Sequence, residues 1–165
     1  MINIFKVPEG TRVIRKGSIP KTVHMIVLPD GVETIEAGAF AGFKNLRCIV
    51  IPNTVQYIGV AAFKGCKELK LAALPAGIET VEKYLFHGCT KLTHVVIPDS
   101  VKRIGRAAFF CCPRLQSIKI PDSVTEIGEL AFAGDAQLNI KIPGRVTIGK
   151  NAFACCPSPN VKTND

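Results

Sequence analysis

A single repeat interval governs this sequence. Prolines from Pro29 to Pro121, phenylalanines from Phe40 to Phe132 and leucines from Leu46 to Leu138 each recur every 23 residues. Three residue classes that keep one period in phase indicate a tandem repeat, because self-similarity at a fixed period of about 23 residues is typical of solenoids and related arrays. A unit of this size is too small to bury its own apolar side, so the units must stack and share one core.

The best-formed unit occupies residues 115–132. Leu115, Ile118 and Ile120 have the spacing of a short strand whose alternate side chains point inward. Pro121 then ends the strand, because proline has no N–H group to continue the ladder. A second apolar pair follows in each unit: Val32/Ile35, Val55/Ile58, Ile78/Val81, Val101/Ile104 and Val124/Ile127. Each unit is therefore expected to form two short strands.

This pattern predicts a mainly β solenoid of stacked coils of about 23 residues, with a parallel sheet and a second short ladder. We expect a single domain over residues 1–165, with residues 1–21 as a degenerate N-terminal cap coil, residues 22–157 as the repeats, and residues 158–165 as the final edge strand and tail. In that last strand Pro159 and Thr163 replace apolar residues, which would protect an open sheet edge. The same alignment places Val161 beside Ile140.

The repeated pattern also resembles a known family. From Ile97 to Leu115 the chain has the form Ile-Pro-Asp-Ser-Val-x-x-Ile-Gly-x-x-Ala-Phe-x-x-Cys-x-x-Leu, which is similar to the BspA-type leucine-rich repeat. The similarity extends from about Val23 to Lys162. It implies a curved leucine-rich-repeat solenoid with a parallel concave sheet. It also implies a binding or adhesion role, since members of that family occur in bacterial surface proteins and in protist proteins and are not known as enzymes.

The outward side chains of the sheet are the candidate binding site. They are apolar in the N-terminal coils, whereas Ser117, Lys119 and Lys141 follow at equivalent places in the C-terminal coils. A contiguous exposed apolar area usually marks an interaction site. The alternatives are that β-branched residues simply suit strands, or that a cap covers them. The candidate partner-binding residues are Met25, Val27, Cys48, Val50, Leu71, Ala73, His94 and Val96, with Arg47 and Lys70 as a basic rim.

Seven cysteines could suggest redox or metal chemistry. Cys66, Cys89 and Cys112 share one repeat position, which is best explained by reduced cysteines that fill one layer of the core. Zinc is the alternative, but the chain has no Cys-x-x-Cys, and His87, two residues from Cys89, does not indicate a tetrahedral site. A cysteine nucleophile would need a nearby base, but His24 and His94 lie several coils apart with no evident acidic partner. A phosphate-binding glycine loop and a nucleophile elbow are also missing. We therefore expect no catalytic residue, no metal site and no cofactor.

Charge and targeting signals limit the partners. The formal charge is +8, from 21 basic and 13 acidic residues that look scattered along the sequence. Nucleic-acid binding is not expected, because aromatic residues are not interleaved with the basic residues and the sequence has no recognised nucleic-acid-binding motif. No apolar run is long enough to span a membrane. Residues 1–20 contain no secretory signal, which favours a cytoplasmic location over a surface or secreted one.

These observations predict a non-enzymatic protein-interaction or scaffold module that binds through its concave sheet face. Its partner would be another protein or a second copy of the chain. The alternative is a surface or secreted adhesion-type fragment that binds a host protein or a carbohydrate.

Overall fold

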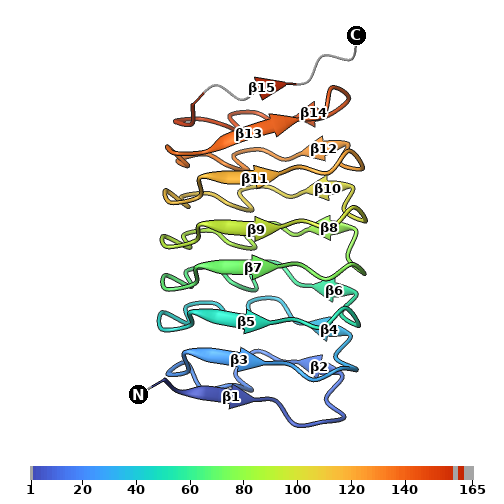
Figure 1. Cartoon of the computed structure of the whole chain (residues 1–165), viewed down its shortest axis with the longest axis vertical. Coiled ribbons are helices and arrows are strands. Elements are labelled where there is room, and N and C mark those ends of the chain that lie inside the picture. The colour runs from blue at the N-terminus through green and yellow to red at the C-terminus, as the bar shows by residue number, and fades with distance from the viewer. Residues whose placement is uncertain (1, 158–159, 162–165) are drawn as a thin grey trace.

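A computed structural model describes residues 2–157 and the backbone of residues 160 and 161. In this part of the chain every regular element is a strand, and the chain winds as a stack of coils from the N-terminus to the C-terminus (Figure 1). No helix that could cross a membrane occurs among these residues. The predicted solenoid of parallel strands is confirmed.

Each coil contributes one strand to a main sheet and one to a second ladder on the opposite side of the coil (Figure 1). The main strands are β1 (Ile4–Lys6), β3 (Met25–Val27), β5 (Cys48–Val50), β7 (Leu71–Ala73), β9 (His94–Val96), β11 (Ser117–Lys119), β13 (Asn139–Ile142) and β15 (Asn160–Val161). The second strands are β2 (Val13–Ile14), β4 (Thr34–Ile35), β6 (Tyr57–Ile58), β8 (Thr80–Val81), β10 (Arg103–Ile104), β12 (Glu126–Ile127) and β14 (Thr147–Ile148). Every pairing is parallel.

The hydrogen-bonded main ladder has three parts. β1, β3 and β5 form the first, β7 and β9 the second, and β11, β13 and β15 the third. Between the first two parts, the N–H of Lys70 still donates to the carbonyl of Arg47 over 3.4 Å. The strands therefore continue as neighbours along the rod while the regular ladder bonding is interrupted (Figure 1).

The register changes at the C-terminal end. Ser117 pairs with Asn139, so this coil is one residue shorter than the regular repeat. Val161 pairs with Ile142 rather than with Ile140, and the alignment expected from sequence is wrong by two residues. A shift of two preserves the alternation of inward and outward side chains, so the alternation alone cannot distinguish the two registers. The substitutions at Pro159 and Thr163 lie outside the described residues.

A stack of aromatic rings runs along the core, as the regular spacing of phenylalanine predicts. The rings of Phe63, Phe86 and Phe109 are fully buried, nearly parallel and 5.4–5.5 Å apart between centroids. The stack continues to Phe40 on one side, and through Phe132 to Phe153 on the other. Because each ring packs against the next, adjacent coils are held in one register over the length of the rod.

The turns that carry these rings bond to one another through a further set of backbone hydrogen bonds. The N–H groups of Phe40, Phe63 and Phe86 donate to the carbonyls of Ala62, Leu85 and Ala108 over 2.7–3.0 Å. Two positions in each turn adopt a positive φ. The first is a glycine at Gly38 but a non-glycine residue in later coils, with φ of 50–60° at Ala61, Tyr84, Ala107, Leu130 and Asn151. The second is Gly42, Gly65, Gly88 or Gly134, but Cys111 and Cys155 occupy it elsewhere.

The glycine that follows the second strand has a different role. Gly59 has no positive φ, as expected from the glutamates Glu36 and Glu82 that occupy the same repeat position. A Cβ atom on Gly59 would lie 2.4 Å from the backbone nitrogen of Ala37 in the preceding coil. This glycine therefore permits close approach of two coils.

Candidate functional site

An apolar strip crosses the exposed face of the main sheet. It consists of Ile4, Met25, Val27, Cys48, Val50, Leu71, Ala73 and Val96, on strands β1 to β9. Val50, Leu71 and Val96 are 47%, 55% and 63% exposed, respectively. Alternation explains the pattern, since the middle residue of each three-residue strand points into the core and its two neighbours point outward.

The structure brings all ten candidate residues to one region. Met25, Val27 and Cys48 are half-buried, whereas Val50, Leu71, Ala73, His94 and Val96 are exposed. Arg47 and Lys70 are exposed immediately before β5 and β7. Ile4, which is 52% exposed and pairs with Met25, extends the strip by one strand and was missed from sequence. The interval from Ile4 to Met25 is shorter than that from Met25 to Cys48, which places β1 outside the regular period.

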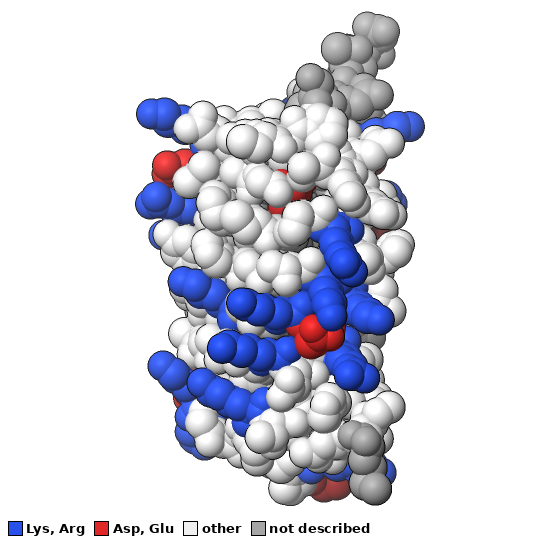
Figure 2. Space-filling view, turned by 90° about the vertical axis from the view of Figure 1, so that its left-hand side faces the viewer, with Lys and Arg blue, Asp and Glu red and all other residues white. Residues whose placement is uncertain are grey.

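A basic edge adjoins this strip where the chain enters the main strands. The basic edge consists of Lys21, Lys44, Arg47, Lys64, Lys67, Lys70 and Lys91. Figure 2 shows Lys and Arg side chains gathered over this side of the rod around an acidic group. The basic residues look scattered in the sequence, but on this face of the structure they are not. The recurrence of lysine at 21, 44 and 67 is the signal that could have predicted it.

Glu68 is the one carboxylate in the turns that form the basic edge. It lies 2.6 Å from the ammonium of Lys91, and this hydrogen bond, with the nearby charges of Arg47 and Lys70, lowers its pKa. Within the described part of the chain, the other six cations of the edge are in no ion pair. The edge therefore keeps most of its positive charge available to a partner.

The remaining ion pairs flank the second ladder. Their carboxylates belong to Glu33, Glu36, Glu79 and Glu129, which face Arg12, Arg15, Lys102 and Arg106 at 2.8–3.8 Å. Acidic and basic groups are thus matched on that side of the rod, in contrast to the basic edge.

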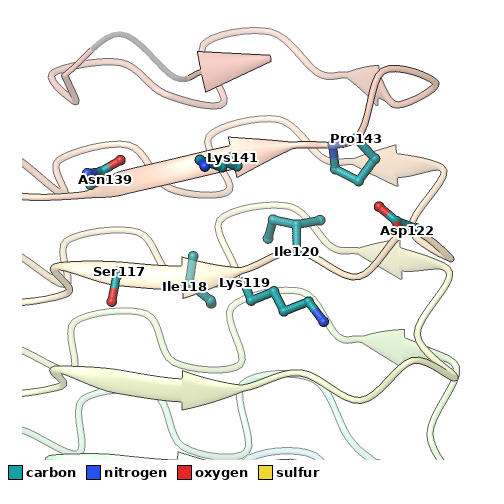
Figure 3. A pocket seen from close by; sticks show the side chains of 8 residues that line it. All are labelled: Ser117, Ile118, Lys119, Ile120, Asp122, Asn139, Lys141 and Pro143. Atoms are coloured by element: carbon teal, nitrogen blue, oxygen red, sulfur yellow. The ribbon is translucent and has the colours of Figure 1, made fainter. Parts of the chain in front are cut away.

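The sheet face of the C-terminal coils is polar and hollowed. An open depression of about 530 Å³ lies over β11 and β13 and is lined by Ser117, Lys119, Asp122, Asn139 and Lys141, among others (Figure 3). Lys119 and Lys141 are paired neighbours on adjacent strands, as are Ser117 and Asn139. Hydroxyl, amide and ammonium groups on one open surface can form hydrogen bonds with a polar ligand.

The cysteine layer is part of the core. The Sγ–H groups of Cys66, Cys89 and Cys112 each donate over 3.2 Å to a carbonyl of an earlier coil, those of Phe40, Phe63 and Phe86. Burial raises the pKa of Cys66 to about 12 and those of Cys89 and Cys112 well above the usual range. These thiols are thus protonated and unsuited to nucleophilic attack at neutral pH.

Asp135 occupies the cysteine position in the turn before β13. It is fully buried; its Oδ1 accepts a hydrogen bond of 2.7 Å from the N–H of Cys112, while Oδ2 has no hydrogen-bond partner among the described residues. Burial raises the pKa of Asp135 to about 8, against the opposing effect of the Cys112 hydrogen bond. The carboxyl is therefore mostly protonated at neutral pH.

The histidines lie in separate environments. His24 accepts a hydrogen bond from the N–H of Asn3, and His94 lies 3.0 Å from the hydroxyl of Thr93. His87 stacks on Phe110, and desolvation together with the nearby charge of Lys64 lowers its pKa. Among the described residues, His, Cys, Asp and Glu side chains form no group of three that could hold a metal ion.

Comparison with known proteins identifies the family. The model of the BspA type leucine rich repeat region matches residues 20–139 and 58–165, in six copies. The chain therefore belongs to this family of leucine-rich-repeat proteins, as the repeated Ile-Pro to Leu pattern predicted. A comparison with curated protein sequences gives no significant match.

Solved structures share the fold. A leucine-rich-repeat protein of T. pallidum is 26% identical with a TM-score of 0.81, over 90% of this chain and 73% of that one. One from Eubacterium ventriosum is 30% identical with a TM-score of 0.70, over 84% and 42%. A leucine-rich cell surface protein of Faecalibacterium prausnitzii is 22% identical with a TM-score of 0.64, over 98% and 60%. The chain thus spans less than two thirds of the length of the last two.

Proposed function

We propose that this chain is a non-enzymatic protein-interaction module that binds its partner through the apolar strip. The observation that carries the proposal is the exposure of Val50, Leu71 and Val96 on neighbouring strands of a sheet whose inner face already fills the core. Left in water these side chains have no compensating contacts, whereas a partner could bury them at about 25 cal/mol per Å² of apolar surface.

The family supports the same conclusion in a general form. Leucine-rich repeats suggest protein interaction, and the fold is that of leucine-rich-repeat proteins. The environment of the cysteines and histidines agrees, because the buried thiols are protonated and the histidines have no acidic partner within the described residues.

A surface or secreted module that binds carbohydrate is the second candidate. The polar depression over β11 and β13 favours it, because its hydroxyl, amide and ammonium groups suit a sugar. The Faecalibacterium prausnitzii protein is described as a cell surface protein, but at 22% identity that likeness carries the fold alone. Cell fractionation with protease treatment of intact cells would separate a surface location from the cytoplasmic one, and a glycan array with Asn139→Ala as control would test sugar binding.

Substitution on the strip tests the main proposal. Val50→Lys with Leu71→Glu places charges in the centre of the strip, and we expect it to abolish partner capture from extracts of the source cells, or self-association measured by sedimentation. Both side chains are exposed, so the melting temperature should change little. Unchanged capture by a folded double variant would contradict the proposal.

The C-terminal coils supply the matched control. Ser117→Glu with Lys119→Glu introduces charges at the same outward positions of β11, where the surface is already polar. This variant should capture the same partner as the unmodified chain. Equal losses in both variants would show that charged side chains placed anywhere on the sheet face disturb binding, and that the apolar strip has no special role.

A further inference from the structure

The apolar strip and the basic edge form one continuous surface. Arg47 and Val50 lie three residues apart along the same extended segment, which corresponds to about 10 Å. Lys70 and Leu71 are adjacent on the next coil. A single protein segment or face can therefore contact the cations and the apolar side chains at the same time.

The charge on this surface is built from repeat positions. Lys21, Lys44 and Lys67 occupy one repeat position in successive coils, and Arg47 and Lys70 form a second row whose backbones are joined by the hydrogen bond from Lys70 to Arg47. In stacked coils such rows have a spacing of about 4.8 Å, which brings like charges close together. Only Glu68 offsets them within the turns that form the edge. Concentrated charge of one sign selects partners of the other sign and steers their approach.

A second copy of the chain, packed strip against strip, is a poor match in charge, because the chain carries a net charge of +8. Two strips packed face to face would bring two basic edges into one assembly, and like charges at an interface cost affinity. The carboxylates of Glu33, Glu36, Glu79 and Glu129 are already paired with cations beside the second ladder. The surface therefore favours a foreign partner over self-association.

Nucleic acids and anionic glycans match the edge but not the strip. Both present charged or hydroxylated groups, whereas Val50, Leu71 and Val96 need apolar side chains to cover them. A protein partner can supply carboxylates and apolar side chains next to each other.

We infer that the partner is an acidic protein segment that seats apolar side chains on the strip and carboxylates on Lys44, Arg47, Lys67 and Lys70 of the basic edge. The inference rests on the proposed function and adds the chemistry of the partner to it. Association is then faster at low ionic strength, because salt screens exposed charges beyond about 10 Å at 0.1 M.

A display library of random-sequence peptides, selected on the immobilised chain, tests this inference. The selected peptides should combine Asp or Glu with apolar residues. Their affinity should fall about tenfold for Lys44→Glu with Lys67→Glu, since two attractive contacts become repulsive. Both lysines are exposed and in no ion pair within the described chain, and a thermal melt checks that the variant is folded.

Lys119→Glu with Lys141→Glu is the matched control, because it changes the net charge by the same amount on the C-terminal part of the sheet. It should change peptide affinity by less than about twofold. A similar loss of peptide affinity in both variants would mean that net charge alone explains the effect, and it would overturn the inference.

The same peptides separate failure of the inference from failure of the proposed function. Peptides that lose binding with Val50→Lys and Leu71→Glu but carry no excess of acidic residues would overturn the acidic partner and leave the strip as the binding surface. Peptides that bind the strip variant as tightly as the unmodified chain would overturn both the acidic partner and the proposed function. Tight binding of heparin or a DNA duplex that depends on the edge and not on the strip would assign the edge to a polyanion instead.

Discussion

The coils that carry β3 to β9 and those that carry β11 and β13 share one core but have different surfaces. In the first group the sheet face is apolar and the adjoining edge is basic, with Lys44, Arg47, Lys67 and Lys70. In the second group the charge lies on the sheet face, at Lys119 and Lys141. A repeat protein can thus vary its outward positions from coil to coil while the inward positions stay fixed, because each coil contacts only its neighbours.

The difference shows that the outward positions, which vary between coils, determine the binding surface. The inward positions, which stay the same, determine the stability. Phe63 and Phe132 lie in equivalent buried stacks although the surfaces above them differ. The comparison predicts that core substitutions act alike in the two groups, whereas surface substitutions do not.

The largest effect is expected for the aromatic stack. Phe86→Ala and Phe132→Ala should each lower the free energy of unfolding by about 3–5 kcal/mol, because each removes a fully buried ring and leaves a cavity between two others. Denaturant unfolding measures both. A loss below about 1 kcal/mol at either position would show that the stack of buried rings does not continue through both groups of coils.

The buried carboxyl of Asp135 should make stability depend on pH. Its pKa is raised to about 8 in the folded chain, so between about pH 4 and pH 8 only the unfolded state ionises, and stability falls as the pH rises. The slope is about 1.4 kcal/mol per pH unit at most. Asp135→Cys, which restores the residue of the neighbouring coils, should remove this slope and raise the free energy of unfolding at pH 7 by up to about 4 kcal/mol.

Urea unfolding at several pH values is the measurement, with Cys89→Asp as the reciprocal variant. That change should introduce a similar slope in the N-terminal group, because Cys89 is as fully buried as Asp135. If the Asp135→Cys protein keeps the original dependence of stability on pH, another titrating group must cause it.

The smallest effect concerns the turns. Gly65 and Gly88 have φ of 71° in the first group, whereas Cys111 has φ of 58° at the equivalent position before β11. Cys111→Gly should raise the free energy of unfolding by about 1 kcal/mol, because glycine adopts this conformation without the steric cost of a Cβ atom. Gly88→Ala should have the opposite sign in the same denaturant series, and equal signs would contradict the explanation.

The fold could be predicted from the sequence because inward positions repeat in phase. The spacing of Phe63, Phe86 and Phe109 predicts a stacked core, and the spacing of Leu115, Ile118 and Ile120 predicts the strand that covers it. The strip could be located in the same way, since alternation determines which side chains point outward. Its role in binding remains a prediction.

Other features could not be predicted because they depend on relations between repeat positions. The sequence showed the basic edge only as the rim of Arg47 and Lys70; its full extent also includes Lys64 and Lys91, which occupy other places in the repeat and join the rim only when the coils stack. The register of Val161 was mistaken because a shift of two residues leaves the in-and-out pattern unchanged. Ile4 was missed because its coil departs from the regular length.

The continuous aromatic stack has a consequence for how such a chain can evolve. Phe63, Phe86 and Phe109 present the same ring, at nearly the same separation, to the coils on either side. An in-frame duplication or deletion of one repeat unit would therefore join surfaces that already fit. The length of the binding surface can then change in whole steps of about 4.8 Å, which lets selection match the rod to partners of different size without redesign of its interior.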